Sequence, residues 1–297
     1  MRSFPLVTVI IPTYNSSGTL RLSLESVLLQ DFAEFEVWVV GDGCSDDTAS
    51  VVESFADKRI HWTNLPDNSG SPSAPRNEGL RHATGELIAY LGHDDLWFPW
   101  HLSELTGCLQ SGNRAEFAYS LGVLLAPTGA TGCFALPEDL SKSGYISPSN
   151  WMHRKSLIDK IGPWAQKVKF GDDREFLRRV FTAGTPVQFR RQLTVLKYPA
   201  AAWRMYSLAS NYPQSNQLNA IRRDPETLRL NLLLEIAGRM VGGPSSPPTH
   251  HLIPLPRWVR KLLPGLLDWY GRDRWPIDTF EHWRWRRLTG LADKRDK

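Results

Sequence analysis

The sequence has 297 residues, of which 41% are hydrophobic, 22% charged and 11% aromatic. This composition excludes a disordered or fibrous protein, and a chain of this length buries enough apolar surface to fold without disulfide bonds. The formal net charge of +4 arises in residues 251–297, where 11 Lys and Arg face 6 Asp and Glu, because the rest of the chain is nearly neutral. We therefore expect a basic surface for an anionic partner only in this tail.

Neither the cysteines nor the N-terminus indicates export, a zinc site or a membrane span. Cys44, Cys108 and Cys133 are widely spaced and form no CxxC motif. The N-terminal apolar run ends at Pro12 without a small-residue cleavage signal, and no later run reaches about 18 uncharged apolar residues. We expect a cytoplasmic protein, with a peripheral position at the inner face of the membrane as an additional possibility.

Four short apolar runs in the first third of the chain predict the strands of a parallel sheet. Each run is rich in Val, Ile and Leu on successive positions, as in strands that helices cover on both faces. Helical segments lie between them, the first over Thr19–Leu29 and the second opening near Asp46 and Asp47, which we expect to cap it. The four predicted strands are Val7–Ile11, Glu36–Val40, Arg59–Trp62 and Leu87–Leu91.

After this region the pattern changes. Residues Phe117–Leu136 alternate around a Pro- and Gly-containing turn, which predicts a hairpin. Two helical segments follow, Lys155–Ile161 and Arg174–Thr182, separated by the loop Gly162–Asp173. The segment GGPSSPP at residues 242–248 is the clear linker, and an amphipathic helical pattern follows it from Leu255 to Leu263.

Polar residues directly follow the predicted strands, where ligands bind in open α/β sheets. They are Pro12, Thr13, Tyr14 and Asn15 after the first strand, Asp42 after the second, and Asp94 and Asp95 after the fourth. Neither a GxGxxG motif after the first strand nor a GxxxxGK[ST] motif is present, so the sequence favours neither a Rossmann dinucleotide site nor a P-loop.

Each of these side chains also has a purely structural interpretation. Asp94 and Asp95 suit Mg²⁺ or Mn²⁺ shared with a diphosphate, but the pair would equally cap a helix over Leu96–Gln110. Asp42 followed by Gly is also typical of a turn. Arg76 follows a loop with two prolines and would either neutralise a phosphate or serve as a surface charge.

Taken together, five segments resemble the family 2 glycosyltransferases, and the resemblance covers about residues 5–210. The segments occur in the family's order, and they read VTVIIPTYN, VVGDGCSDDTASVV, APRNEGLRHATGELIAYLGHDDLW, WMHRKSLIDKIGPW and GDDREFLRR. The resemblance implies a GT-A type α/β fold, with a central, mostly parallel sheet flanked by helices and a mainly helical C-terminal extension. It also implies metal-dependent transfer of a sugar from a nucleotide-sugar, with a UDP-sugar expected, to an acceptor hydroxyl with inversion.

The resemblance also assigns roles on the donor side. Pro12, Thr13 and Tyr14 would border the base and ribose with Asn15 beside them, and Asp42 would hydrogen-bond the uracil. Arg76 would lie near the base and phosphate. Asp94 would lie nearer the ribose and Asp95 nearer the Mn²⁺ or Mg²⁺. The family's usual Asp-x-Asp-Asp motif has Gly92 in its first position here.

On the acceptor side, Gly171-Asp172-Asp173 resembles the family's Gly-Glu-Asp segment, whose final aspartate is the general base. We expect Asp173 to be this base and Asp172 to be the fallback. The structural alternative is that both residues cap the helix Arg174–Thr182. The expected division of the chain is a catalytic domain in residues 1–241, with a donor half in 1–110 and an acceptor half in 111–241. The linker 242–248 and a basic, Trp- and Arg-rich extension in 249–297 follow.

The extension holds five of the twelve tryptophans, interleaved with arginines. This pattern suits packing against the catalytic domain, an oligosaccharide, or peripheral contact with anionic lipid, and it favours nucleic acid least. The expected acceptor is a glycan or a lipid-linked saccharide, with polysaccharide biosynthesis for the cell envelope as the family's common setting. Two alternatives remain, a nucleotidyltransferase and a degenerate nucleotide-sugar-binding or interaction module, which Gly92 would favour.

Overall fold

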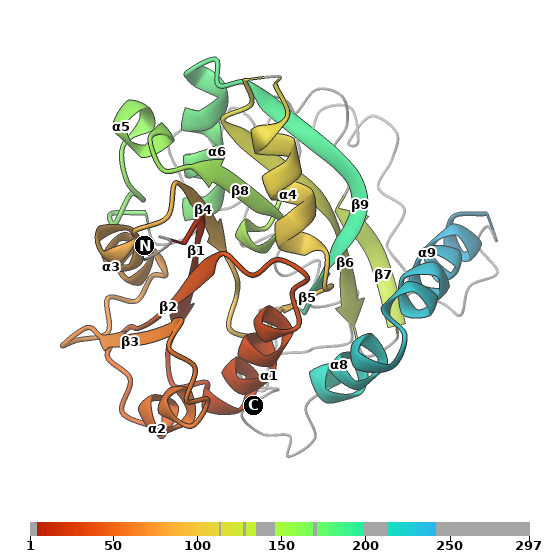
Figure 1. Cartoon of the computed structure of the whole chain (residues 1–297), viewed down its shortest axis with the longest axis horizontal. Coiled ribbons are helices and arrows are strands. Elements are labelled where there is room, and N and C mark those ends of the chain that lie inside the picture. The colour runs from red at the N-terminus through yellow and green to blue at the C-terminus, as the bar shows by residue number, and fades with distance from the viewer. Residues whose placement is uncertain are drawn as a thin grey trace, which may run out of the picture.

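The computed structural model describes residues 5–112, 114–126, 129–134, 146–168, 171–198 and 213–241. The predicted linker 242–248, the extension 249–297 and the amphipathic helix within it lie outside these residues. Figure 1 shows the described elements wrapped around one long sheet.

The first part of the chain forms the predicted parallel sheet. Strand β1 pairs in parallel with β2 and β4, and β2 pairs in parallel with β3. All seven residues of β1 are buried, which explains why its sequence is apolar on successive positions rather than alternating. The elements are β1 (Val7–Thr13), α1 (Ser17–Leu28), β2 (Phe35–Gly41), α2 (Thr48–Glu53), β3 (Ile60–Asn64), α3 (Ser73–His82) and β4 (Leu87–Tyr90).

The second part contains the predicted hairpin, formed by β6 and β7, and three strands that the sequence analysis did not identify, β5, β8 and β9. Its elements are β5 (Leu96–Trp97), α4 (His101–Gln110), β6 (Phe117–Ala126), β7 (Gly129–Phe134), the 3-10 helix η1 (Pro148–Asn150), β8 (Trp151–Arg154), α5 (Leu157–Ile161), α6 (Asp172–Thr182), β9 (Val187–Lys197), α8 (Pro213–Arg223) and α9 (Pro225–Val241).

The sheet as a whole is mixed, which corrects the expectation of a mostly parallel sheet. Its strand order is β3-β2-β1-β4-β8-β6-β9-β5, with β7 on β6. Of the eight strand pairs in the described residues, four are parallel and four antiparallel. Helical crossovers keep β1 to β4 parallel, whereas the later strands include a hairpin and direct returns across the sheet, which produce antiparallel pairs.

Two predicted helix boundaries are wrong, and both errors affect the site. The helix expected from Leu96 starts at His101, because Leu96 and Trp97 form strand β5 against β9. The helix expected from Arg174 starts at Asp172, after Gly171 with a positive φ of 74°. Asp94 and Asp95 therefore do not cap α4, whereas Asp172 and Asp173 lie in the first turn of α6.

The C-terminal helices of the described chain, α8 and α9, pack beside β7 and α1 at one end of the sheet (Figure 1). Leu218, Ile221 and Leu232 of these helices are buried in a cluster that includes Phe98 and Leu196. A segment distant in sequence therefore lies close to the polypeptide that follows β4.

Candidate functional site

The polar residues after β1, β2 and β4 lie at one edge of the sheet. Since β1 pairs in parallel with both β2 and β4, the strand ends at Thr13, Gly41 and Tyr90 face the same way. In open α/β folds this edge is where ligands bind. The structure thus gathers the loops that carry the predicted residues, while the roles of the individual residues stay predictions.

In the loop after β1, Asn15 organises the protein itself. Its Oδ1 accepts hydrogen bonds from the backbone N–H groups of Ser45 at 2.8 Å and Asp46 at 3.3 Å. Thr13 is buried, and within the described residues its Oγ1 has no hydrogen-bond partner. The carbonyl oxygen of Pro12 lies 3.3 Å from His93 Nδ1, and Tyr14 is 46% exposed. In this segment, the exposed ring of Tyr14 and the unbonded hydroxyl of Thr13 are therefore the groups left to contact a ligand.

Asp42 is buried and links the β2 loop to the loop before α3. Both of its carboxylate oxygens lie 3.1 Å from the backbone N–H of Ser69, and Oδ2 also accepts from Ser69 Oγ at 3.1 Å. The next residue, Gly43, has a φ of 72°, and a Cβ there would lie 2.6 Å from the backbone N of Asn68. The backbone conformation and the close approach therefore require glycine after Asp42, and Asp42 holds the loop of residues 68–70 through Ser69.

The Asp94–Asp95 pair has one buried and one partly exposed member. The Asp95 side chain is fully buried, and its oxygens accept from Ser149 Oγ at 2.5 Å, Lys197 Nζ at 2.9 Å and the Tyr198 backbone N–H at 3.1 Å. Asp94 is partly exposed, and its backbone carbonyl accepts from Gln214 Nε2 of α8 at 3.1 Å. Burial raises the pKa of Asp94, and the charge of Asp95 raises it further.

Gly92 has a steric reason to be glycine. A Cβ at this position would lie 2.9 Å from Asp95 Oδ2 and 3.0 Å from Asp94 Oδ1. The Gly92 N–H donates to Ser149 Oγ at 3.0 Å, which in turn holds Asp95. The loop is thus folded tightly over the two carboxylates and does not accommodate a third aspartate without movement.

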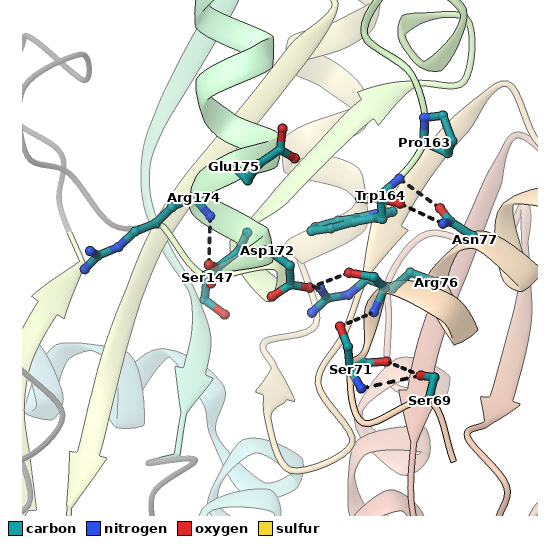
Figure 2. Close-up of polar contacts among 12 residues, drawn as sticks. Ser69, Ser71, Arg76, Asn77, Ser147, Pro163, Trp164, Asp172, Arg174 and Glu175 are labelled. Carbon is teal, nitrogen blue, oxygen red and sulfur yellow. Dashed lines mark hydrogen bonds and ion pairs between the residues drawn. The ribbon is translucent and has the colours of Figure 1, made fainter. Parts of the chain in front are cut away.

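The second aspartate pair meets α3 through a buried ion pair (Figure 2). Asp172 Oδ2 accepts from Arg76 Nη1 at 2.6 Å and from Ser73 Oγ at 3.1 Å. The Arg76 guanidinium also lies 4.2 Å from the ring centroid of Trp164, whose backbone is held by two hydrogen bonds with the Asn77 side chain. Arg76 and Asp172, which were predicted in separate roles, are therefore partners of each other.

Asp173 follows in the first turn of α6 and is partly exposed. Its Oδ1 accepts the backbone N–H of Arg174 at 2.8 Å. Burial lowers the pKa of Lys197, but the negative charges of Asp95, Asp94 and Asp173 and the hydrogen bond to Asp95 outweigh it, so this pKa lies above its usual value. Asp173 therefore shares an electrostatic environment with the first pair, although the two pairs are far apart in sequence.

Three residues at the site were missed by sequence reasoning. Ser149 and Lys197 bind Asp95, and Gln214 binds the backbone of Asp94. A lone lysine at the end of an apolar run and a lone serine in a loop carry no local signal. Only the approach of η1, β9 and α8 to the loop after β4 reveals them.

Asp94 and Asp95 do not form a complete metal site by themselves, but they fit a site that a substrate phosphate completes. Among the residues that the structure describes, no three His, Cys, Asp or Glu side chains are grouped to hold a metal ion. However, Mg²⁺ is commonly bound by one or two carboxylates while substrate phosphates and water complete its shell. Asp94 satisfies that requirement because it is partly exposed. Asp95, with three internal donors, is the less suitable ligand, which is the reverse of the order expected from the sequence.

Comparison with known proteins shows a family similarity in the first part of the chain. Residues 8–118 match the model of glycosyl transferase family 2. The UDP-Glc:alpha-D-GlcNAc-diphosphoundecaprenol beta-1,3-glucosyltransferase WfgD of Escherichia coli is 33% identical over 136 residues, which are 46% of this chain and 53% of WfgD. The chain thus spans about half the length of this relative.

Solved structures support the fold. Residues 1–349 of Staphylococcus aureus TarS in complex with UDP-GlcNAc match with a TM-score of 0.57 at 20% identity, over 86% of this chain and 77% of that one. The mannosyltransferase PcManGT of Pyrobaculum calidifontis, in complex with GDP-Man and Mn²⁺, matches with a TM-score of 0.54 at 16% identity, over 98% and 85%. Across the described segments, no helix combines the length and apolarity needed to cross a bilayer. The chain therefore resembles glycosyl transferase family 2 over residues 8–118, and its fold is of the GT-A type.

Proposed function

We propose that the protein is an inverting glycosyltransferase that moves a sugar from a nucleotide-sugar to an acceptor hydroxyl. The observation that carries this proposal is the gathering of Asp42, Asp94 and Asp95 at one sheet edge. It is accompanied by the buried ion pair of Arg76 and Asp172, which places the partly exposed Asp173 at the start of α6. A UDP-sugar is the expected donor, since WfgD is named for UDP-Glc and TarS binds UDP-GlcNAc. A glycan or a lipid-linked saccharide is the expected acceptor.

On the donor side, the exposed ring of Tyr14 and the unpartnered hydroxyl of Thr13 suit the base and ribose. Asp42 would meet the base while it keeps the 68–70 loop in place. Arg76 acts through its ion pair with Asp172 and orders the two halves of the site rather than binding the phosphate alone. Asp94 would hold Mn²⁺ or Mg²⁺ together with the diphosphate, and the bound ion would supply positive charge to the leaving group.

On the acceptor side, Asp173 would act as the general base. As the acceptor oxygen bonds to the anomeric carbon and the bond to the diphosphate oxygen breaks, the hydroxyl proton passes to the Asp173 carboxylate. Asp172 is the weaker candidate because Arg76 and Ser73 already occupy its carboxylate. This direct displacement from the opposite face inverts the anomeric configuration.

Calorimetry with UDP, dTDP and GDP, each with Mn²⁺, Mg²⁺ or EDTA, tests the donor site. We expect UDP to bind more tightly with metal, Asp94→Asn to remove the metal-dependent part, and Asp173→Asn to leave binding intact. Release of UDP from UDP-sugars then tests the base, and Asp173→Asn should slow it by about 10²- to 10⁴-fold. Absence of nucleotide binding under every metal condition would overturn the proposal.

The second candidate is a catalytically degenerate nucleotide-sugar-binding module, which Gly92 at the first motif position favours. The same assays separate the two, because such a module would bind UDP without releasing it from any UDP-sugar.

For the whole chain, we propose a catalytic domain in 1–241 and a C-terminal extension in 249–297 that contacts the inner membrane surface. Co-sedimentation with vesicles containing anionic lipid, compared with neutral vesicles, tests this contact. Loss of sedimentation on replacing the arginines at 284, 286 and 287 by glutamine would support it, and equal sedimentation with both kinds of vesicle would contradict electrostatic docking.

A further inference from the structure

Lys197 occupies its position because of strand register. Leu96 of β5 pairs with Leu196 of β9 in an antiparallel arrangement, so Asp95, one residue before Leu96, lies beside Lys197, one residue after Leu196. The Lys197 side chain is 15% exposed, whereas the side chain of Asp95 is fully buried. The lysine thus joins the buried Asp95 carboxylate to a partly exposed position, and the charge of Asp94 also acts on it.

The hydrogen bond to Asp95 uses only part of the donor capacity of the Lys197 ammonium group. Two other donors, Ser149 Oγ and the Tyr198 backbone N–H, already bind its carboxylate. An ammonium carries three N–H donors, and within the described residues Lys197 Nζ donates one hydrogen bond, to Asp95 Oδ2 at 2.9 Å. A largely buried cation with unused donors is costly unless a further anion or water meets it.

The charge balance around Lys197 is negative. Lys197 Nζ contacts Asp95 Oδ2, and the negative charges of Asp94 and Asp173 also raise the pKa of this ammonium group. A diphosphate that approached this group would be repelled unless cations received it. Lys197 is the cationic side chain that the described residues place among these carboxylates.

We propose that Lys197 is a built-in cationic contact for the donor's diphosphate, so that part of the diphosphate affinity persists without any divalent cation. This inference rests on the proposed function as a nucleotide-sugar enzyme. It differs from a structural role, in which Lys197 would only neutralise Asp95 and would affect folding but not discriminate between ligands with and without phosphate.

The test compares UDP with uridine by calorimetry in EDTA. The wild-type protein should bind UDP more tightly than uridine, and Lys197→Met should weaken UDP binding by about 10- to 100-fold, the effect of one charged hydrogen bond, with uridine binding unchanged. Lys197→Arg should restore part of the UDP affinity. Equal losses for UDP and uridine, or no loss for either, would overturn the inference.

Two further variants keep the test valid if Lys197→Met folds poorly. The double variant Lys197→Gln/Asp95→Asn removes both charges and keeps hydrogen-bonding groups, so its melting curve should resemble that of the wild type. Asp95→Asn alone removes the ion-pair partner of Lys197 and keeps the lysine charge. The UDP affinity of this variant in EDTA should equal or exceed that of the wild type. The double variant should have the weak affinity of Lys197→Met.

The outcomes also separate this inference from the proposed function. If UDP binds with Mn²⁺ but all three Lys197 variants bind it as the wild type does in EDTA, the inference fails and the proposed function stands. If UDP binds under no metal condition, both fail.

Discussion

The pairs Asp94–Asp95 and Asp172–Asp173 lie in different local structures. The first pair is in a loop after a strand and the second is in the first turn of a helix, yet both pairs consist of one buried and one partly exposed side chain. In each pair one member is buried and bound to a cation, Asp95 to Lys197 and Asp172 to Arg76. The other member is partly exposed. The adjacent carboxylates are therefore not interchangeable, since one joins segments distant in sequence through an ion pair and the other is partly exposed.

The position of the buried member differs between the pairs, and the local backbone explains why. Asp95 directly precedes strand β5 and turns inward with the sheet, so the second residue is buried. Asp172 is the first residue of α6, and its side chain points back toward α3, so there the first residue is buried (Figure 2). The order of exposed and buried members could not be transferred from one motif to the other.

The largest expected effect concerns the buried member of the second pair. Asp172→Ala leaves Arg76 buried without its counter-ion, which should lower the free energy of unfolding by about 3–5 kcal/mol. Urea denaturation measures this loss. The matched control, Asp173→Ala, should lose much less, and equal losses would remove the distinction between the two members.

Two buried histidines pack against aromatic residues that follow the two pairs in the sequence. His101 stacks on Trp97 after the first pair, and His153 packs against Phe176 of α6. Burial lowers the pKa of His101 to about 3 and that of His153 to about 4, although a backbone hydrogen bond opposes the shift at His153.

Since these folded-state values lie below the ordinary value near 6.5, the unfolded chain binds more protons in acid. Stability is therefore complete above pH 6.5 and falls as the pH drops toward 4, by roughly 3 kcal/mol for His153. Urea titrations between pH 7 and 4.5 measure the slope. The free energy of unfolding of the His153→Phe variant should fall less steeply with decreasing pH. The same slope as in the wild type would contradict the lowered pKa of His153.

A third carboxylate should not fit beside the first pair. Gly92→Asp restores the family's usual motif, but its Cβ would approach Asp95 Oδ2 and Asp94 Oδ1. We expect a loss of about 1–3 kcal/mol from overpacking, with added charge repulsion. Thermal unfolding with Gly92→Ala as the control separates the two causes. A variant as stable as the wild type would show that the loop relaxes easily.

Removal of the Asp94 charge should stabilise the protein, in contrast to the preceding variants. Burial and the neighbouring Asp95 disfavour the ionised form of Asp94. Asp94→Asn should therefore raise the free energy of unfolding at pH 7 by about 1 kcal/mol while it weakens metal-dependent nucleotide binding. Denaturation and calorimetry on the same sample measure both, and a loss of stability would mean that Asp94 is structural.

The smallest effect extends the comparison to a third pair, Asp46–Asp47, which we predicted to cap α2. Asp46 Oδ1 accepts from the Thr48 backbone N–H at 3.2 Å and from Thr48 Oγ1 at 2.5 Å, whereas Asp47 makes no side-chain cap hydrogen bond. Asp46→Ala should cost about 0.5–1 kcal/mol and Asp47→Ala close to nothing. Thermal unfolding of both variants would detect a reversed order.

The sequence alone determined the parallel strands β1 to β4 and the loops at their ends, because short runs of branched apolar residues and the polar residues after them are local signals. The five segments in their order also indicated a resemblance to the family 2 glycosyltransferases, whose model matches residues 8–118. Ser16, by contrast, stands at the N-cap position of α1, a place that favours serine, but its hydroxyl donates to the Tyr14 carbonyl at 2.8 Å and does not cap the helix. Local patterns therefore located elements more reliably than they assigned hydrogen bonds.

Only the tertiary structure decided which carboxylate of each pair is buried. That choice depends on partners about 100 positions away, Arg76 for Asp172 and Lys197 for Asp95, and on η1, which supplies Ser149. The register of β5 against β9 brings Lys197 to Asp95, and no pattern within either strand encodes this register. Desolvation and ion pairing act between segments that meet only in the folded chain, so these roles are set by the fold.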